Sequence, residues 1–467
     1  MWPIRDLRAN GLMAAKVFIG SAAGFAGDRS DAGIPVVGAL AAHSGPRFLM
    51  YETLAERTLA LCQLERRKDP ARGYSTALDR LLTPVLKQCL AAGIRVVGNF
   101  GAANPPMAAR RIAEIARSLG LPAPRIAIVE GDDLSGRLSA SELARRETGG
   151  KILAQMRDII SANLYLGAQP IAHALDQGAD IVVTGRVADS ALALGPLLHV
   201  FRWRAEDWDR LAAGTLAGHL LECGAQVTGG YFADPGYKDV TGLAEVGYPI
   251  AEIDADGDIV ITKPAGTGGV VNRLTVIEQL LYEIHDPAAY FAPDVVLDLT
   301  GVDVLEIGKD RVRVTGARGK PAPEMLKATV CVEGGILGEA EISYAGVNAA
   351  ARARLAGEVI CERMQRRAPG LVIRIDAIGA VSVLGNSSVA PDLRASESED
   401  IRLRFSAQSA DAAQIEMLLV EVEALYCAGP AGGAGLRRRA TPRLASAACL
   451  VERRYAEPRV TLFGAPV

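Results

Sequence analysis

Small and polar residues follow four of the strands that this sequence predicts, and they could form one binding site. The strings are GSAAGFAGDR (20–29), GNFGAANP (98–105), EGDD (130–133) and TGRVAD (184–189). Small residues let backbone amides approach a ligand, and Arg29 and Arg186 could each bind a carboxylate or phosphate with two hydrogen bonds. Because the carboxyl ends of parallel strands meet at one edge of a sheet, we expect a pocket there. The alternative is that these strings only make turns and helix caps.

A second group lies in the string GHLLECG (218–224). On a helix, Glu222 and Cys223 come three and four residues after His219, so the three side chains share one face. His219 with Glu222 could carry protons, and His219 with Cys223 could generate a nucleophilic thiolate. The alternatives are a metal site, or a partly buried histidine capped by its neighbour beside a small core cysteine.

A third group is the glycine-rich string KPAGTGG (263–269), between a predicted hairpin and a predicted helix. Glycine-rich backbone before a helix start, with Lys263 at its edge, suits an anion such as a carboxylate or phosphate. The alternative is a plain connection between the hairpin and the helix.

These three groups give two sets of candidate site residues. The candidates for proton transfer or nucleophilic attack are Asp28, Asp189, His219, Glu222 and Cys223. The candidates for substrate binding are Gly20, Ser21, Gly24, Arg29, Asn99, Gly101, Asn104, Arg186, Lys263, Thr267, Gly268 and Gly269. The sequence leaves open whether a divalent ion binds at Asp132 and Asp133.

The glycine-rich loop at 20–27 does not match the common nucleotide-binding motifs. Its pattern is G-x-x-x-G-x-x-G, which differs from the dinucleotide motif G-x-G-x-x-G, and it lacks the Lys-Ser/Thr of a phosphate-binding P-loop. We therefore predict no cofactor, with coenzyme A (CoA) entering only as part of a substrate. A nucleotide-dependent ligase or dehydrogenase is disfavoured for the same reason.

Composition excludes several classes of protein. The 467 residues carry 51 Lys and Arg against 54 Asp and Glu, a formal charge of −3, so a dedicated nucleic-acid or membrane surface is not expected. The hydrophobic fraction of 49% is typical of a protein with a packed core. Seven cysteines without a CxxC pair indicate reduced thiols, and no apolar run is long enough to span a membrane. We expect a cytoplasmic protein.

Strands alternate with helices over residues 14–235, after a tail at 1–13. The predicted strands are 16–20, 47–51, 94–100, 125–130 and 180–185, and the helices are 52–66, 76–92, 105–120, 171–178, 188–198 and 207–223. This alternation predicts an α/β domain with a Rossmann-like, mostly parallel sheet that carries the main pocket.

The pattern changes after residue 235. Residues 236–286 form a connector that contains a hairpin at 250–262, with Asp256-Gly257 at its turn, and a helix at 274–284. Residues 287–467 combine paired strands with helices at 349–367 and 410–426, which predicts an α+β two-layer sandwich domain. The predicted strands there are 311–315, 327–332, 337–343, 371–383 and 401–406, with more within 443–463.

Several strings, in order along nearly the whole chain, resemble the acyclic terpene utilisation (AtuA) family. Besides GSAAGFAGDR, GNFGAANP and KPAGTGG they are LAERT (54–58), GAQPI (167–171), TGRVADSALALGPL (184–197), GHLLECGAQVTGGYF (218–232), QLLYEIHDPAAY (279–290) and GPAGGAG (429–435). The resemblance implies a role in the breakdown of acyclic terpenoids through branched acyl-CoA intermediates. Longer family members carry an added ferredoxin-like module, so the resemblance also implies a separately encoded small subunit of that fold as a partner.

Two functions remain open at this point. The first is an enzyme that acts on a branched hydroxy or unsaturated acid, or its CoA thioester, by hydratase, dehydratase or lyase chemistry, which needs an acid, a base and an anion-binding group. The second is a non-catalytic subunit that binds an acyl-CoA or serves as a scaffold in a catabolic complex. We expect a homo-oligomer in either case.

Overall fold

The computed structural model describes residues 16–155, 158–383, 385, 393 and 398–464. The tail expected at 1–13 lies outside these residues. The chain divides into two compact units, which we call unit 1 (Met1–Cys331 with Ser446–Val467) and unit 2 (Val332–Ala445). The sequence analysis placed the second domain at 287–467 instead. Residues 287–331 and 446–464 belong to unit 1, where their strands join its sheets.

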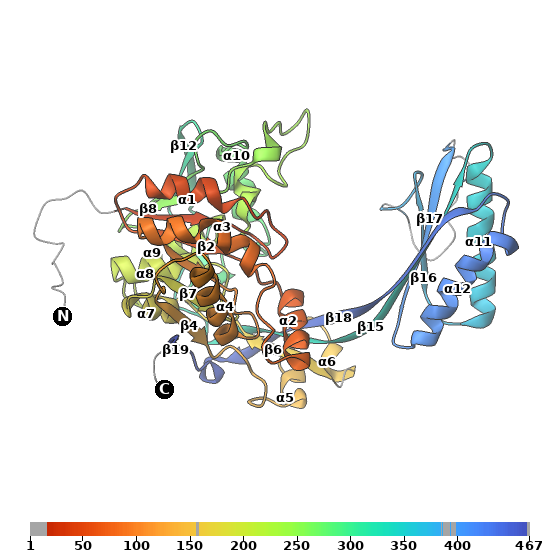
Figure 1. The fold of residues 1–467 in the computed structure, drawn as a ribbon, viewed down its shortest axis with the longest axis horizontal. Helices are drawn as coiled ribbons and strands as arrows, with labels where there is room; N and C mark the ends of the chain where they lie inside the picture. The colour runs from red at the N-terminus through yellow and green to blue at the C-terminus, as the bar shows by residue number, and fades with distance from the viewer. Residues whose placement is uncertain (1–15, 156–157, 384, 386–392, 394–397, 465–467) are drawn as a thin grey trace, which may run out of the picture. The chain divides into compact units, whose positions relative to one another are not determined.

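Unit 1 is built around a ten-stranded mixed sheet (Figure 1). Its centre is parallel, in the order β1 (Val17–Ser21), β2 (Arg47–Tyr51), β3 (Arg95–Gly98), β7 (Ile181–Thr184), β4 (Ile126–Glu130). Antiparallel strands extend it from β1 through β8 (Ile250–Ile253), β9 (Ile259–Thr262), β13 (Arg311–Thr315) and β12 (Asp303–Gly308), and β19 (Arg459–Leu462) pairs with β4. The expected parallel strands are therefore present, and the complete sheet is mixed.

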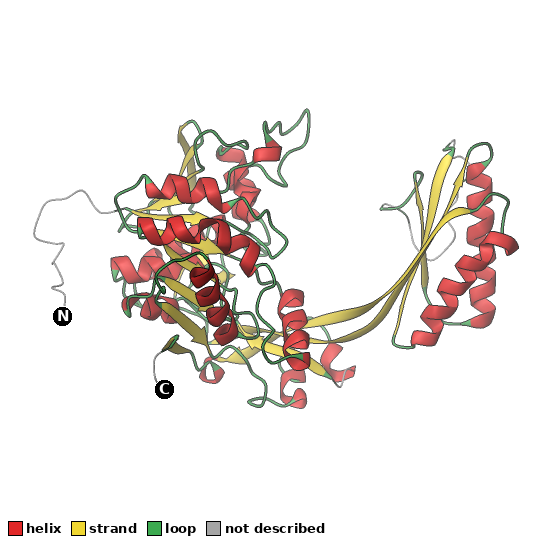
Figure 2. Cartoon of the chain, in the orientation of Figure 1, coloured by secondary structure: helices red, strands yellow, loops and turns green. Residues whose placement is uncertain are grey.

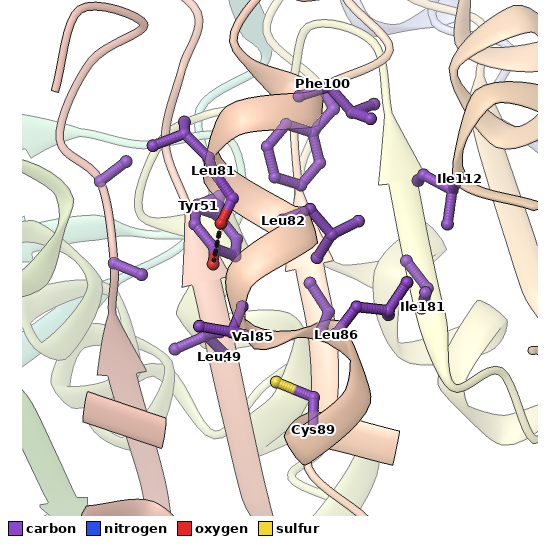
Figure 3. Packing of buried hydrophobic residues seen from close by; sticks show 14 of the residues in the cluster. Leu49, Tyr51, Leu81, Leu82, Val85, Leu86, Cys89, Phe100, Ile112 and Ile181 are labelled. Carbon is purple, nitrogen blue, oxygen red and sulfur yellow. Dashed lines mark hydrogen bonds between the residues drawn. The ribbon is translucent and has the colours of Figure 1, made fainter. Parts of the chain in front are cut away.

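Helices pack on both faces of this sheet. On one face lie α1 (Gly33–Ala41), α3 (Leu78–Ala92) and α4 (Pro105–Ser118), which share one hydrophobic core with the strands. Figure 3 shows that core, where Tyr51 donates its hydroxyl to the Leu81 carbonyl oxygen at 3.1 Å. On the other face lie α7 (Gln169–Asp176), α8 (Ala191–Phe201) and α9 (Trp208–Glu222). Apolar strand residues are buried toward both layers, as expected for a sheet covered on two sides.

The remaining elements of unit 1 include several that the sequence analysis did not predict. The connection from β4 to β7 contains α5 (Ala140–Ala144), β5 (Glu147–Thr148), α6 (Ile152–Gln155) and β6 (Ile159–Leu164). The other elements are α2 (Glu56–Lys68), η1 (Gly224–Thr228), η2 (Leu243–Glu245), α10 (Arg273–Leu281), η3 (Arg453–Tyr455) and a small sheet of β10 (Tyr290–Phe291), β11 (Val296–Asp298) and β14 (Arg318–Lys320). Within the described residues, no helix has the length and apolar character needed to span a membrane.

Unit 2 has the connectivity β-α-β-β-α-β. Its elements are β15 (Met325–Ala345) from Val332 onward, α11 (Ala349–Arg367), β16 (Ile373–Ile378), β17 (Asp400–Ser409), α12 (Ala412–Ala428) and β18 (Ala434–Glu452) as far as Ala445. The strand order β16-β17-β15-β18 with this connectivity is that of the ferredoxin-like motif. Helices α11 and α12 lie on one face of the sheet (Figure 2). They share with its strands a hydrophobic core separate from that of unit 1. Two strands predicted at 327–332 and 337–343 form the single strand β15.

Candidate functional site

A cavity of about 1430 Å³ lies in unit 1 at the carboxyl ends of β1, β2 and β7. The loop after β1 contributes Asp28 to its lining, the segment after β2 contributes Glu52, and the loop after β7 contributes Arg186 and Asp189. The C-terminal end of α9 adds His219, Glu222 and Cys223. Three strand ends and one helix end therefore converge, as expected for an open sheet of this kind.

His219 and Glu222 form a hydrogen-bonded pair at the wall of this cavity. Nδ1 of His219 lies 2.9 Å from Oε1 of Glu222, because residues three apart on α9 share a face. Burial alone would lower the pKa of His219, but the hydrogen bond and charge of Glu222 outweigh it and raise that pKa. Nε2 of His219 is buried and has no hydrogen-bond partner in the described structure. Among the described residues, one ring nitrogen of this lining residue is thus without a hydrogen bond, although the backbone of Leu280 and Gln279 also faces the imidazole.

Arg186 is 1% exposed and is held by short-range contacts on several sides. Its guanidinium donates to the carbonyl oxygens of Val187 (2.8 Å) and Leu54 and to Oδ1 of Asp189. The guanidinium carbon also lies 4.5 Å from the centre of the Tyr165 ring. Arg186 is thus a positive charge that Asp189 and two carbonyl oxygens hold in one place.

Glu52 is a buried carboxyl beside these charges. Its Oε1 accepts hydrogen bonds from the Leu54 amide and from Nδ2 of Asn99, both at 2.8 Å. Burial, followed by the nearby charge of Asp189, raises the pKa of Glu52 to about 8, although Arg186 opposes the shift. Glu52 therefore carries a proton at neutral pH.

Glu56 has the opposite protonation state although it lines the same cavity. Tyr165 donates its hydroxyl to Oε1 of Glu56 at 2.7 Å, and Nζ of Lys327 lies 3.3 Å from the same oxygen. Burial would raise the pKa of Glu56, but these two partners lower it to about 2. The cavity thus holds one protonated and one ionised glutamate within a single segment after β2.

Asp28 and Cys223 line the cavity but are less available for reaction. Asp28 accepts hydrogen bonds from the hydroxyl of Tyr248 and from the Gly24 amide, the latter at 2.7 Å. Burial raises the pKa of the Cys223 thiol to about 12, and Glu222 adds to the shift, so the thiolate is scarce at neutral pH.

Several predicted binding residues lie outside the cavity lining. Gly20 and Ser21 are buried within β1, where a side chain on Gly20 would meet Val36. Arg29 binds Asp31 at 2.7 Å and the Ala244 carbonyl oxygen at 3.0 Å, which ties its loop to η2. Of the predicted residues, the cavity lining includes Gly24, Asp28, Arg186, Asp189, His219, Glu222 and Cys223.

The residues that follow β3 also have structural contacts. Asn99 is buried and donates a hydrogen bond to Glu52, so it contacts a lining residue without lining the cavity itself. Gly101 packs against the Thr184 carbonyl oxygen, and Asn104 donates to the carbonyl oxygens of Pro70 (2.9 Å) and Arg72 (2.6 Å).

The glycine-rich loop at 263–269 is closed upon itself. Nζ of Lys263 donates to the Thr267 carbonyl oxygen at 2.9 Å and lies 3.5 Å from Oδ2 of Asp310. The Thr267 hydroxyl donates to the Pro264 carbonyl oxygen at 2.6 Å. Gly268 approaches the Gly242 backbone, and Gly269 has a φ of +82°. None of these four predicted residues lines the cavity. The Lys263 ammonium group is hydrogen-bonded within its own loop.

Asp132, one of the two residues considered for a divalent ion, is bound by protein groups. Its Oδ2 accepts from Nδ2 of Asn163 (2.7 Å) and from the Arg186 amide (3.0 Å). Burial raises the pKa of Asp132 to about 6. Among the residues that the structure describes, no group of three or more His, Cys, Asp or Glu side chains is arranged to hold a metal ion.

The sequence analysis missed Glu52, Glu56, Tyr165 and Lys327. Glu52 directly follows the predicted strand 47–51, so the rule applied to the other strand ends would have found it. It was instead assigned to a helix, which begins only at Glu56. Tyr165 follows β6, a strand that was not predicted, and Lys327 comes from β15, far away in sequence. Nothing local marks those two residues.

A protein-family model matches nearly the whole chain. The family model described as "Acyclic terpene utilisation family protein AtuA" matches residues 17–462. Neither the curated proteins nor the solved structures gave a match. The matched range includes every residue of the cavity lining named above.

Proposed function

The chain belongs to the acyclic terpene utilisation family AtuA, and from this premise we propose that it is a catabolic enzyme with acid–base chemistry. Its substrate in this proposal is a branched hydroxy or unsaturated carboxylic acid, or the CoA thioester of such an acid. The reaction is of the hydratase, dehydratase or lyase type. The family's name supports a role in terpene utilisation, while the chemistry rests on the cavity.

One observation carries the proposal: Nε2 of His219 is buried and unpartnered beside a cavity, while Nδ1 is engaged by Glu222. A carboxylate on one ring nitrogen fixes the tautomer and stabilises the imidazolium that forms when the other nitrogen accepts a proton. His219 is therefore the general base of this proposal, and Glu222 orients it.

The other predicted residues of the cavity take supporting roles. Arg186 supplies a fixed positive charge near the acid or thioester group, and Asp189 holds the guanidinium in place. Asp28 anchors Tyr248 and Gly24 at the wall, and Cys223 contributes a protonated thiol to the lining. The proposal also keeps the Rossmann-like interpretation of the first domain, which the parallel pairing of β1, β2, β3, β7 and β4 supports.

In the dehydrating direction, Nε2 of His219 takes a proton from the carbon next to the carboxyl or thioester group. The electron pair of that C–H bond becomes the new C=C bond, and the C–O bond to the hydroxyl breaks with its pair going to oxygen. The hydroxyl leaves as water once it has received a proton. Hydration is the reverse of these steps, so the same base returns its proton to carbon.

Solvent deuterium incorporation tests this proposal. The purified protein in D₂O would be given 3-hydroxy-3-methylbutanoate, 3-methylbut-2-enoate and their CoA thioesters, and mass spectrometry would follow deuterium at the α-carbon. We expect incorporation that His219→Gln lowers by on the order of 10²–10⁴-fold, the usual contribution of a general base. His173→Gln is the matched control, since His173 is exposed on α7 and does not line the cavity.

Binding of the thioesters without deuterium incorporation in the wild-type protein would argue for the alternative, a non-catalytic acyl-CoA-binding or scaffold subunit. Incorporation by His219→Gln at the rate of the His173→Gln control would instead contradict the role of His219 as the general base.

A further inference from the structure

The proposed reaction needs a proton donor for the departing hydroxyl, and most carboxyls of the cavity are committed elsewhere. Asp189 is paired with Arg186, Asp28 accepts from Tyr248, and Glu222 is bonded to His219. Glu56 is ionised by its contacts with Tyr165 and Lys327, and Glu283 and Glu324 are exposed. The remaining carboxyl of the lining is Glu52, which is buried and carries a proton that it can donate.

We propose that Glu52 is this donor, that its transferable proton sits on Oε2, and that Asn99 is the positioning residue that keeps it there. The inference rests on the proposed function and deepens it, because it assigns the acid that works opposite His219. Neither residue was predicted as an acid or as its support from the sequence.

The position of the proton follows from the two hydrogen bonds to Oε1. The Leu54 amide and Nδ2 of Asn99 both donate to this oxygen at 2.8 Å. These two N–H donors use both lone pairs of Oε1, so the carboxyl proton must sit on the other oxygen, Oε2. Within the described structure Oε2 accepts no hydrogen bond, and Glu52 keeps 7% of its surface exposed while lining the cavity.

The orientation of the Asn99 amide is fixed by Thr53. The Thr53 backbone N–H and hydroxyl donate to Oδ1 of Asn99 at 2.7 and 3.1 Å. A backbone N–H can only donate, so Oδ1 must face Thr53 and Nδ2 must face Glu52. Because Asn99 is fully buried at the end of β3, this arrangement cannot rotate freely.

The surroundings of Glu52 favour the protonated form at neutral pH. The charged and titratable groups that face it are Asp189 and Arg186 after β7 and Cys223 after α9. Burial and Asp189 together raise the pKa of Glu52 to about 8, while Arg186 and the two N–H donors limit the rise. Such a value is suited to a general acid that must release its proton near neutral pH.

In the dehydration step, the C–O bond breaks with its electron pair on oxygen as that oxygen takes the proton from Oε2. Glu52 is left as a carboxylate that the Leu54 and Asn99 N–H groups stabilise. His219 holds the proton from carbon, so the protein's total of protons is unchanged until solvent returns them to their starting groups.

Infrared difference spectroscopy tests the proton's location without any substrate. The spectrum of the wild-type protein minus that of Glu52→Gln at pH 7 should contain the C=O stretch of a protonated carboxyl, which should disappear above about pH 8. Glu56→Gln is the matched control and should show no such band at pH 7, because that carboxyl is ionised. Asn99→Ala removes a donor that stabilises the carboxylate, so the band should persist to higher pH.

Turnover of the probe acids tests the donor role. Glu52→Gln should lower dehydration of 3-hydroxy-3-methylbutanoate, or of its CoA thioester, by on the order of 10²–10⁴-fold. In Asn99→Ala the alkaline limb of the pH profile should move to higher pH, which loss of packing alone would not cause.

The inference is overturned if the wild-type minus Glu52→Gln spectrum lacks a protonated carboxyl at pH 7, or if Glu52→Gln dehydrates the probes at nearly the wild-type rate. Both results leave a His219-dependent deuterium incorporation intact. If instead no probe incorporates deuterium, the proposed function fails and the donor role fails with it, whatever the spectrum contains.

Discussion

At the residue scale, the buried proton of Glu52 couples the stability of the protein to pH. The pKa of Glu52 is about 8 in the folded state, against an ordinary value of 4.5. Between these values the folded state holds a proton that the unfolded state has lost. The contribution of this group to the free energy of unfolding is therefore fully present below pH 4.5, and it is lost as pH rises toward 8.

Glu52→Gln removes this dependence, because an amide does not titrate. We expect the difference between its melting temperature and that of the wild-type protein to increase from pH 5 to pH 9, as measured by thermal unfolding at matched ionic strength. Glu56→Gln provides a contrast, since the pKa of Glu56 is lowered from 4.5 to about 2. The stabilisation from its charge is lost only as pH falls below about 4.5, so the difference between Glu56→Gln and wild type should stay constant between pH 5 and pH 9. A difference between Glu52→Gln and wild type that is the same at pH 5 and pH 9 would contradict the assignment.

Residues paired by local spacing could be predicted from the sequence, and residues paired by tertiary contact could not. The pairing of His219 with Glu222 could be predicted because a spacing of three residues on a helix places both side chains on one face. The pKa of Glu52 depends on Asp189 and Asn99, which reach it only through the pairing of β2 with β3 and of β3 with β7. Lys263 was predicted to bind an anion, and nothing in the sequence marks its contact with the Thr267 carbonyl oxygen.

At the element scale, helix α9 must approach the loop after β7 closely for the cavity to form. A side chain on Gly218 would place its Cβ 2.4 Å from the Ser190 carbonyl oxygen and 2.6 Å from the Ser190 Cα. Both are backbone atoms, so neither can move aside as a flexible side chain could. The glycine next to His219 therefore sets the distance between His219 and the loop that carries Asp189.

Gly218→Ala should destabilise the protein by about 1–3 kcal/mol through overpacking and should lower turnover by displacing His219. Gly38→Ala is the matched control, because Gly38 lies in α1 with no atom within 4 Å of an added Cβ. It should stabilise the protein by about 0.5–1 kcal/mol, the usual gain from alanine in a helix. Chemical denaturation of both variants measures the two effects, and equal shifts of the same sign would contradict the close contact at Ser190.

Elements were predictable where one pattern sufficed. Strand β2, the hairpin β8–β9 and helix α11 lie where period and turn residues indicated. Helix α1 was missed because its sequence GIPVVGALA is apolar almost throughout and has no helical period. Strand β15 was split in two because Gly334 and Gly335 interrupt its pattern, although Gly335 adopts a φ of +78° within a continuous strand.

At the scale of the whole molecule, the order of elements in the sequence does not mark the units. Strands β12 and β13 come after residue 287, where strands begin to occur in pairs, yet β13 pairs with β9 in the sheet of unit 1. Strand β19 near the C-terminus pairs with β4, placing Arg459 opposite Glu130. Such long-range pairings cannot be deduced from composition or period.

Unit 2 has the ferredoxin-like strand order, which the family resemblance had associated with a module outside this chain. Its core is made by residues of β15, β16, β17, α11 and α12, and it is separate from the core of unit 1. The expectation of an additional small subunit stays a prediction. A unit with its own core and its own sheet order has the features of an independently folding domain.

Two separate cores predict two thermal transitions, each responding to changes in its own core. Leu82 and Leu403 are both fully buried, the first in the unit 1 core and the second in the unit 2 core. Truncation to alanine should cost about 2–5 kcal/mol in either place. In differential scanning calorimetry of the full chain, Leu403→Ala should lower one transition by roughly 10 °C or more and leave the other in place. Leu82→Ala should lower only the other transition, by roughly 3–7 °C, because unit 1 is about three times larger than unit 2. A single transition that both variants lower together would show that the two cores unfold as one, and the cavity of unit 1 would then depend on unit 2 for its stability.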